Sequence, residues 1–146
     1  MNREEIKNLI PHREPMLLLD EVEIDENNVS HGKYAIRGDE FFLQGHFPGF
    51  PVVPGVILCE IMAQSCSLLI GKGIIEYVPM YAGIDNMHFK ASVYPGDTLE
   101  ITSRITASKG KMYFVDSEAT VKGKTVCKGS ISFALIPKDQ LLASRK

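Results

Sequence analysis

Alternating hydrophobic and polar positions predict that most of this chain is β-strand. The alternation is clearest at 99–107, where Leu99, Ile101 and Ile105 are separated by polar residues, as in a strand with one buried face. Five further segments have the composition of strands: 16–24, 29–37, 80–90, 112–121 and 125–136. A polar turn at 25–28 and short Gly-containing links at 108–110 and 122–124 join neighbouring segments. This arrangement predicts an antiparallel sheet of about six strands.

Helical segments are fewer, and prolines and glycines set their limits. A short helix is predicted at 3–9, where a proline soon follows. Residues 41–54 are predicted to be loop, because three prolines recur there at every third position. A longer helix begins at Pro54 or Gly55, runs to about Ile70 and ends at the Gly-Lys-Gly sequence that follows.

The longer helix has apolar side chains on every side. They are Val56, Ile57, Leu58, Ile61, Met62, Leu68 and Leu69. A helix that is apolar all round is expected to be buried all round. A small antiparallel sheet can cover such a helix by curling around it. We therefore expect one α+β domain over residues 1–146, with about six strands wrapped around a buried central helix.

Composition narrows the functional classes. The chain has 146 residues, 45% of them hydrophobic and 23% charged, and a net charge of −2. These values are typical of one globular domain and give no basic face for nucleic acid. The N-terminus resembles no signal peptide, and the longest apolar run is too short to span a bilayer. We expect a soluble, cytoplasmic protein that binds neither nucleic acid nor membrane.

Three cysteines are present, Cys59, Cys66 and Cys127, without the spacing of a redox or zinc motif. We expect them to be reduced, buried side chains. The sequence also contains no phosphate-binding loop, no dinucleotide-binding motif and no metalloprotease motif. It predicts neither a metal site nor a bound cofactor.

Glu60 is unusual because it lies in the second turn of a helix without a polar face. A buried carboxylate must find a partner or bind a proton. Gln64, one turn further on, lies within reach of it. One interpretation is a structural Glu–Gln pair that fixes the helix. The other is a general acid whose pKa is raised by burial.

His46 lies in the proline-stiffened loop directly before this helix. A histidine in a loop is most often a surface residue or a hydrogen-bonded core residue. A rigid loop, however, is what a catalytic base needs in order to be held in position. His12, His31 and His88 lack such a context, and we assign them no catalytic role.

Gly55 opens the helix, where unpaired backbone N–H groups and the positive end of the helix dipole can bind an oxyanion. Its glycine would allow a substrate to approach closely, although a plain helix start explains it as well. Together, a base, an acid and an oxyanion donor without a nucleophile or cofactor favour proton-transfer chemistry such as β-elimination.

These residues fall within motifs that resemble those of the FabZ-type 3-hydroxyacyl-[acyl-carrier-protein] dehydratases. The central motif is GHFPGFPVVPGV at 45–56, continued by Glu60 and by Met-Ala-Gln at 62–64. Ile-Pro-His-Arg-Glu-Pro-Met-Leu-Leu-Leu-Asp at 10–20 matches the N-terminal motif of that family, and Pro-Gly-Asp at 95–97 a later one. The resemblance covers about residues 8–136.

The resemblance implies a hot-dog fold, homodimers that often assemble three to a hexamer, and active sites at the dimer interface. One subunit would contribute His46 as the base and the other Glu60 as the acid. The Gly55 N–H would bind the thioester oxygen. The Val52 carbonyl would orient the imidazole, and Gln64 would support Glu60. The reaction implied is dehydration of (3R)-3-hydroxyacyl-ACP to trans-2-enoyl-ACP in type II fatty acid biosynthesis, without a cofactor.

Two details refine this expectation. A sister family that also isomerises its product carries Asp where this chain has Glu60, so Glu60 favours plain dehydration. Many relatives have Arg-Phe-Arg where this chain has His88, Phe89 and Lys90, a change that can affect carrier docking. The anionic phosphopantetheine arm of the carrier would pass basic residues, for which Lys90 and Arg13 are candidates.

Two other functions compete with dehydration. A hot-dog thioesterase would activate water with a carboxylate and would not need the stiffened histidine loop. A non-catalytic acyl-thioester sensor would need an output domain, and this chain has no length for one. Dehydration is the interpretation that uses all the residues singled out above.

Overall fold

The computed structural model describes residues 1–70 and 76–143, with six strands in one antiparallel sheet. The strands are β1 (Glu21–Ile24), β2 (Ser30–Ala35), β3 (Tyr77–Phe89), β4 (Thr98–Lys109), β5 (Met112–Val121) and β6 (Lys124–Pro137). Their order is β1-β2-β4-β5-β6-β3. The helical elements are α1 (Arg3–Ile6), a 3₁₀ turn η1 (Phe41–Leu43), α2 (Gly55–Ser65), α3 (Ser67–Ile70) and α4 (Lys138–Ala143).

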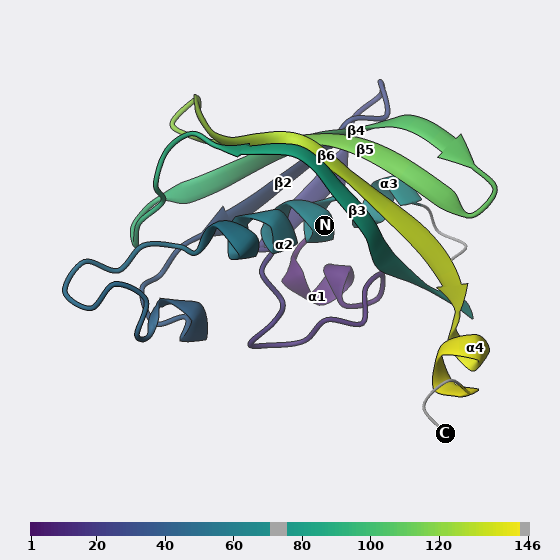
Figure 1. The fold of residues 1–146 in the computed structure, drawn as a ribbon, viewed down its shortest axis with the longest axis horizontal. Coiled ribbons are helices and arrows are strands. Elements are labelled where there is room, and N and C mark those ends of the chain that lie inside the picture. The colour runs from purple at the N-terminus through teal and green to yellow at the C-terminus, as the bar shows by residue number, and fades with distance from the viewer. Residues whose placement is uncertain (71–75, 144–146) are drawn as a thin grey trace.

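The sheet arches over α2, while α1 and the N-terminal segment lie on the other side of that helix (Figure 1). Helix α2 contacts β2, β4 and β5. Ile61 and Met62 of the helix are fully buried, as are Leu99 and Ile101 of β4. The apolar residues of the alternating pattern at 99–107 therefore point toward the helix. The expected α+β arrangement, a sheet around a central helix, is confirmed.

The first predicted strand is wrong in its first half, because only Glu21–Ile24 is strand. The backbone before it bonds to a side chain instead. Gln64 accepts a hydrogen bond from the Leu18 N–H (2.8 Å) and donates one to the Met16 carbonyl (2.8 Å). The segment around Leu17, Leu18 and Leu19 is buried against the helices without joining the sheet.

The central helix is shorter than predicted, because α2 ends at Ser65 and α3 is a separate short helix. The Ser65 hydroxyl donates to the Met62 carbonyl (2.8 Å), and the Cys66 thiol contacts the same carbonyl (3.2 Å). The Ser65 carbonyl accepts from the Ser30 hydroxyl of β2 (2.6 Å). Such bonds compete with the helical ladder and end it here. The stop predicted at 71–73 lies outside the described residues.

The other predicted elements agree with the structure within a few residues. The predicted helix at 3–9 forms only as α1, followed by a turn, and α4 was not expected. The link between β5 and β6 is Lys122-Gly123, both with positive φ (52° and 78°), as in a tight hairpin turn. All three cysteines are free and buried, as predicted.

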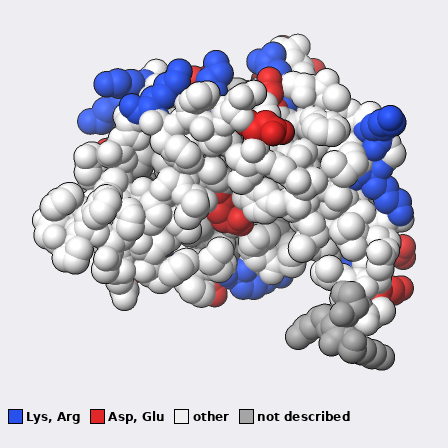
Figure 2. Space-filling view, in the orientation of Figure 1, with Lys and Arg blue, Asp and Glu red and all other residues white. Residues whose placement is uncertain are grey.

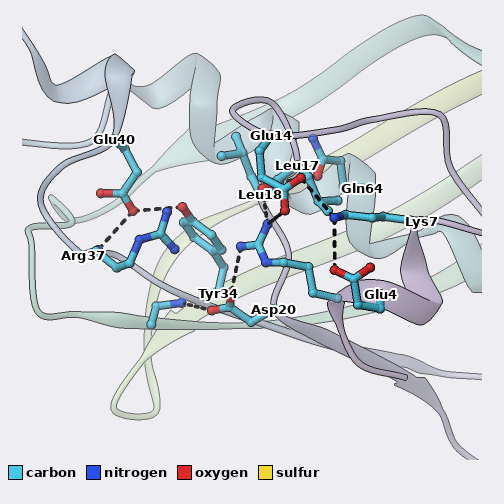
Figure 3. A network of polar contacts seen from close by, with 12 residues as sticks. Glu4, Lys7, Glu14, Leu17, Leu18, Asp20, Tyr34, Arg37, Glu40 and Gln64 are labelled. Carbon is cyan, nitrogen blue, oxygen red and sulfur yellow. Dashed lines mark hydrogen bonds and ion pairs between the residues drawn. The ribbon is translucent and has the colours of Figure 1, made fainter.

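A polar network joins the N-terminal segment to β2 (Figure 3). Arg3 donates to Asp20 (2.9 Å) and to the Leu17 carbonyl (2.9 Å). Glu40 accepts from the Tyr34 hydroxyl at 2.9 Å. The contacts of Arg3 hold the segment before β1, and the contact between Tyr34 and Glu40 holds the loop after β2. No helix among the described residues is long and apolar enough to cross a membrane.

We expected helix α2 to be buried on every side, but within one chain it is not. Val56, in its first turn, is 75% exposed. Further large apolar side chains are exposed on the preceding loop and on β3: Phe47, Phe50, Met80, Tyr81, Ile84 and Phe89. The face that shows α2 and β3 in Figure 1 is largely free of Lys, Arg, Asp and Glu (Figure 2). One chain alone leaves this part of the helix uncovered.

Candidate active site

His46 is held by the backbone of its own loop. Its Nδ1 lies 2.7 Å from the Val52 carbonyl oxygen, and its ring stacks on Phe47 with the centroids 4.5 Å apart. A carbonyl oxygen can only accept, so Nδ1 carries the hydrogen, and in the neutral ring Nε2 has the free lone pair. The contact expected between Val52 and the imidazole is present.

The conformation of this loop depends on unusual backbone angles. Gly45, Phe47 and Gly49 all have positive φ, with values of 79°, 55° and 95°. Glycine adopts this region easily, whereas a phenylalanine there is strained. Phe47 is also exposed, so a large side chain occupies a strained position beside His46 without being buried by its own chain. Such a combination is common at functional sites.

Glu60 lies in α2, half-buried, and both of its carboxyl oxygens have donors. Oε2 accepts from Gln64 Nε2 at 3.0 Å and lies 3.3 Å from His12 Nε2. Oε1 accepts from the Tyr81 hydroxyl at 3.0 Å. The donors therefore come from three parts of the chain, namely α2 itself, the N-terminal segment and β3.

The expected raised pKa of Glu60 is wrong for the single chain. Burial alone would raise this pKa. Hydrogen bonds from His12, Gln64 and Tyr81 to the ionised carboxylate, with the charge interaction with His12, outweigh burial and hold the pKa of Glu60 below its usual value. In the isolated chain the carboxyl is thus held as an anion.

The side-chain amide of Gln64 makes three hydrogen bonds. Besides donating to Glu60, it binds the backbone of the N-terminal segment through both its amide oxygen and its amide nitrogen. The pairing of Glu60 and Gln64 one helical turn apart is as the sequence predicts. Because the amide is tied at both ends, its NH₂ group points at the carboxylate in one orientation only.

Gly55 is the first residue of α2, after the N-cap Pro54. The phenyl ring of Phe89 lies directly against it, so that an added Cβ would come within 2.9 Å of Phe89 Cε1. A larger residue at this position would therefore push the half-exposed Phe89 ring away from the start of the helix. As the first residue of a helix of 11 residues, its N–H has no partner within the helix and is available to an acceptor.

The structure does not bring the proposed base and acid together within one chain. In residues 1–70 and 76–143, no hydrogen bond or ion pair joins His46 to Glu60. The loop of His46 extends away from the body of the molecule (Figure 1). Two cavities of about 650 and 520 Å³ lie over the outer side of the sheet, the larger of them also against the N-terminus, and neither lining includes His46 or Glu60.

Sequence reasoning missed two residues of this site, His12 and Tyr81. His12 received no role, yet its Nε2 faces Glu60 and its Nδ1 is buried without a partner among the described residues. Its position inside the Ile-Pro-His-Arg motif was the signal that could have drawn attention to it. Tyr81 gave no signal, because an aromatic residue on a predicted strand is ordinary and Phe89 lies on the same one.

Comparisons with known proteins agree with this architecture and these motifs. The model of the FabA-like domain matches residues 10–130. The chain is 44% identical over 138 residues to the 3-hydroxyacyl-[acyl-carrier-protein] dehydratase FabZ of Clostridium perfringens, covering 92% of this chain and 99% of that protein. It is 38% identical over 144 residues to FabZ of Clostridioides difficile, covering 94% and 99%.

Solved structures with the same fold are more distant in sequence. The dehydratase heterocomplex ApeI:P of Xenorhabdus doucetiae superposes with a TM-score of 0.80 at 19% identity, covering 97% of both chains. The fluoroacetyl-CoA thioesterase FlK superposes with a TM-score of 0.70 at 15% identity, covering 86% of this chain and 96% of FlK. These likenesses show the hot-dog fold, whereas the family follows from the sequence matches. The chain belongs to the FabA-like family, among the 3-hydroxyacyl-[acyl-carrier-protein] dehydratases of the FabZ type.

Proposed function

We propose that this protein converts (3R)-3-hydroxyacyl-ACP to trans-2-enoyl-ACP and water in type II fatty acid biosynthesis, by acid–base catalysis without a cofactor. His46 removes a proton from C2, and Glu60 gives a proton to the departing 3-hydroxyl, which leaves as water. The enzyme is left with protonated His46 and ionised Glu60, and return of the proton restores the starting state.

The observation that carries this proposal is the contact between His46 Nδ1 and the Val52 carbonyl. It fixes the tautomer in which Nε2 is the proton acceptor, and it fixes the direction of the ring. A base held in this way loses little entropy when the substrate binds. A hot-dog thioesterase that activates water with a carboxylate would have no use for it.

Gly55 supplies the electrostatic part of the proposed mechanism. As C2 loses its proton, negative charge develops on the thioester oxygen. The N–H of Gly55 and the positive end of α2 are suited to stabilise that charge. The ring of Phe89 lies close to Gly55, so it borders the place where the thioester oxygen would bind.

Glu60 must carry a proton to act as the acid. Water around the site stabilises the ionised carboxylate and so keeps the pKa of Glu60 low. The single chain leaves Tyr81 and Val56 near the site exposed. We propose that a partner subunit and the acyl chain cover this region and remove water from it. Added desolvation favours the neutral carboxyl and raises the pKa of Glu60 toward the range in which it can donate.

We propose that the functional unit is a homodimer, assembled further as a trimer of dimers, with each site shared between two chains. The exposed apolar side chains of β3 and of the His46 loop supply a surface that needs a cover. Strand β3 is also an edge of the sheet. His46 of one subunit would then act with Glu60 of the other.

The acyl chain would lie along the apolar surface of α2, and the phosphopantetheine arm would enter past basic residues. Lys90 is exposed and suited to this role. Arg13 is less suited, because its guanidinium donates to the backbone carbonyls of Lys7, Ile10 and His12. Three free cysteines fit the cytoplasmic location expected for such an enzyme.

The test of this function is Glu60→Gln, which keeps the shape of the side chain and removes the acid. We expect turnover of 3-hydroxyacyl-ACP to fall roughly 10²–10⁴-fold while the protein stays folded. The rate is followed by the absorbance of the enoyl thioester, and folding by circular dichroism. Near-normal turnover in the folded variant would contradict the role of Glu60.

Two controls separate dehydration from its alternatives. Asp139→Asn removes a carboxylate on α4, away from the site, and should leave turnover unchanged. A saturated acyl thioester cannot lose water, so the wild-type protein should not consume it. Its hydrolysis by the wild-type protein, without dehydration of the hydroxyacyl substrate, would identify a thioesterase instead.

A further inference from the structure

The side chain of Tyr81 reaches the proposed acid from the edge strand. Its hydroxyl lies 3.0 Å from Glu60 Oε1 and 3.3 Å from the Cys59 carbonyl oxygen. Its ring packs on Phe133 of β6, with the centroids 5.8 Å apart. The pairing of β3 with β6 shifts register between Tyr81 and Gly83. Such an irregularity changes the direction in which a strand side chain points.

The Tyr81 hydroxyl can act here only as a donor. Tyr81 is partly exposed, but the part of it that is packed against the protein loses hydration, and this desolvation, followed by the nearby charge of Glu60, raises the pKa of Tyr81 above its ordinary value. The phenol therefore keeps its proton around neutral pH. Both groups facing the hydroxyl are acceptors, and the carboxylate is the nearer of the two. A hydrogen bond to an ionised acceptor is also the stronger kind.

The two oxygens of Glu60 are held from different sides. Gln64 and His12 face Oε2, whereas Tyr81 alone donates to Oε1 among the described residues. The terminal torsion of a glutamate is broad and weakly restrained by itself. Two anchors on one oxygen leave the carboxyl plane free to turn about that oxygen. A third anchor on the other oxygen fixes the plane.

We propose that Tyr81 is a positioning residue, which fixes the plane of the Glu60 carboxyl and thereby sets where and when the acid of the reaction can release its proton. This inference rests on the proposed function of Glu60. Tyr81 itself need not touch the substrate. Its effect passes through Oε1, so its removal should alter both the alignment of the acid and its affinity for a proton.

Other groups near Glu60 also affect the protonation equilibrium of its carboxyl. His12 faces it from the N-terminal segment and Gln64 from α2. The thiol of Cys59, the neighbouring residue on the helix, also interacts with its charge. In the proposed dimer the partner's His46 would be a further neighbour. The experiment must therefore change the Tyr81 hydroxyl alone.

Tyr81→Phe makes that change, because it keeps the ring that packs on Phe133. Removing a donor from the anion makes protonation easier, so the pKa of Glu60 should rise, by about one unit. The midpoint can be read without any activity by ¹³C NMR of glutamate-labelled dimer, with Glu60→Gln identifying the signal. The basic limb of the turnover–pH profile should move up by the same amount, and the maximal rate should fall about 10-fold.

The matched control is Tyr113→Phe. Tyr113 lies on β5 and pairs with the same Phe133 from the opposite side of β6, so it loses an identical hydroxyl beside the same ring. We expect no movement of the Glu60 midpoint and no shift of the basic limb in this variant.

The outcomes separate the two proposals. If the midpoint and the basic limb of Tyr81→Phe coincide with those of the control while the wild type dehydrates its substrate, the role of Tyr81 is overturned and the proposed function stands. If the midpoint moves only in Tyr81→Phe but the wild type forms no enoyl product, the contact stands and the assigned reaction is overturned. A matching shift of midpoint and basic limb supports both.

Discussion

At the scale of single residues, Glu40 shows how a buried carboxylate can serve stability and not chemistry. It is 6% exposed and accepts hydrogen bonds from the Tyr34 hydroxyl and from the backbone N–H groups of Arg37 and Gly38, at 2.9, 3.0 and 2.7 Å (Figure 3). Burial would raise its pKa, but these donors outweigh burial and lower it. The anion therefore holds the turn after β2 in place.

This makes the stability of the protein dependent on pH. Because the native pKa of Glu40 lies below that of the unfolded chain, its contribution is fully present above about pH 4.3 and is lost as the pH falls through the native pKa. Glu40→Gln should lower the free energy of unfolding by about 1–3 kcal/mol at pH 7, and it should lose less stability than the wild type on acidification. Urea unfolding at pH 7 and below pH 4 measures both effects.

Asp39→Asn is the control for Glu40. Asp39 is the preceding residue, its side chain is 81% exposed, and within the described part of the chain its ion pair is a long one, 3.4 Å from Arg37 Nε. Neutralising it should change stability by a few tenths of a kcal/mol at most. An equal loss in the two variants would mean that the network around Glu40 contributes nothing specific.

Residues with reactive groups in unusual places could be found from the sequence, and so could Gln64, one helical turn from Glu60. The residues that contact Glu60 from distant parts of the chain could not. Glu60 stands out on an apolar helix, and His46 stands out between prolines. Tyr81 donates to Glu60 across 21 residues of sequence, and no local pattern reports that distance. The predicted direction of the Glu60 pKa was wrong for the same reason: burial and Gln64 could be expected from the sequence, whereas the contacts of His12 and Tyr81 with Glu60 could not.

At the scale of elements, alternation at 99–107, together with the composition of five other segments and the turns between them, located all six strands, and tertiary contacts changed the ends of some of them. The segment at 16–20 is apolar enough for a strand, but its backbone is bound by Gln64. The central helix is apolar through Leu69, but Ser30 of β2 binds the carbonyl of Ser65. In both places one polar side chain from a distant element replaced a backbone bond that periodicity had implied.

Close contact between α2 and β2 depends on Gly32. A Cβ added there would lie 2.8 Å from the Ser65 Cβ and 3.2 Å from Leu19 Cδ1. Gly32→Ala should therefore force the helix away from the sheet and lower the free energy of unfolding by about 1–3 kcal/mol, as measured by urea unfolding. Lys33→Ala, at the next position and on the outer face, should change it by less than about 1 kcal/mol. Equal values would contradict close packing at Gly32.

At the scale of the whole molecule, the separation of His46 from Glu60 can be tested by mixing inactive chains. His46→Ala and Glu60→Gln are refolded together, and each is also refolded alone. In a mixed dimer one interface site has both residues and the other has neither. Random pairing makes half of the dimers mixed, so recovery should approach a quarter of the wild-type rate, whereas each variant alone stays inactive.

Light scattering, together with a size tag on one variant, shows whether mixed dimers have formed. If they have formed and the mixture remains inactive, both residues act from the same chain. Losses during refolding can lower the recovered rate. They cannot produce activity if both residues must come from one chain, because each variant chain lacks one of them.

The open edge at β3 also affects how readily a newly folded chain aggregates. The opposite edge, β1, is only four residues long and its Glu21 pairs with Asn2 in an isolated bridge. Strand β3 is 13 residues long and exposes Met80, Tyr81, Ile84 and Phe89, so another strand could pair with it. In the proposed dimer a second copy covers the exposed apolar side chains near this edge, so aggregation is most favoured before that dimer has formed. The pairing of β3 with β6 shifts register at Tyr81/Gly83 and Asp85/His88. Such irregularities bend and twist a strand, which makes this edge a poorer template for a flat foreign strand.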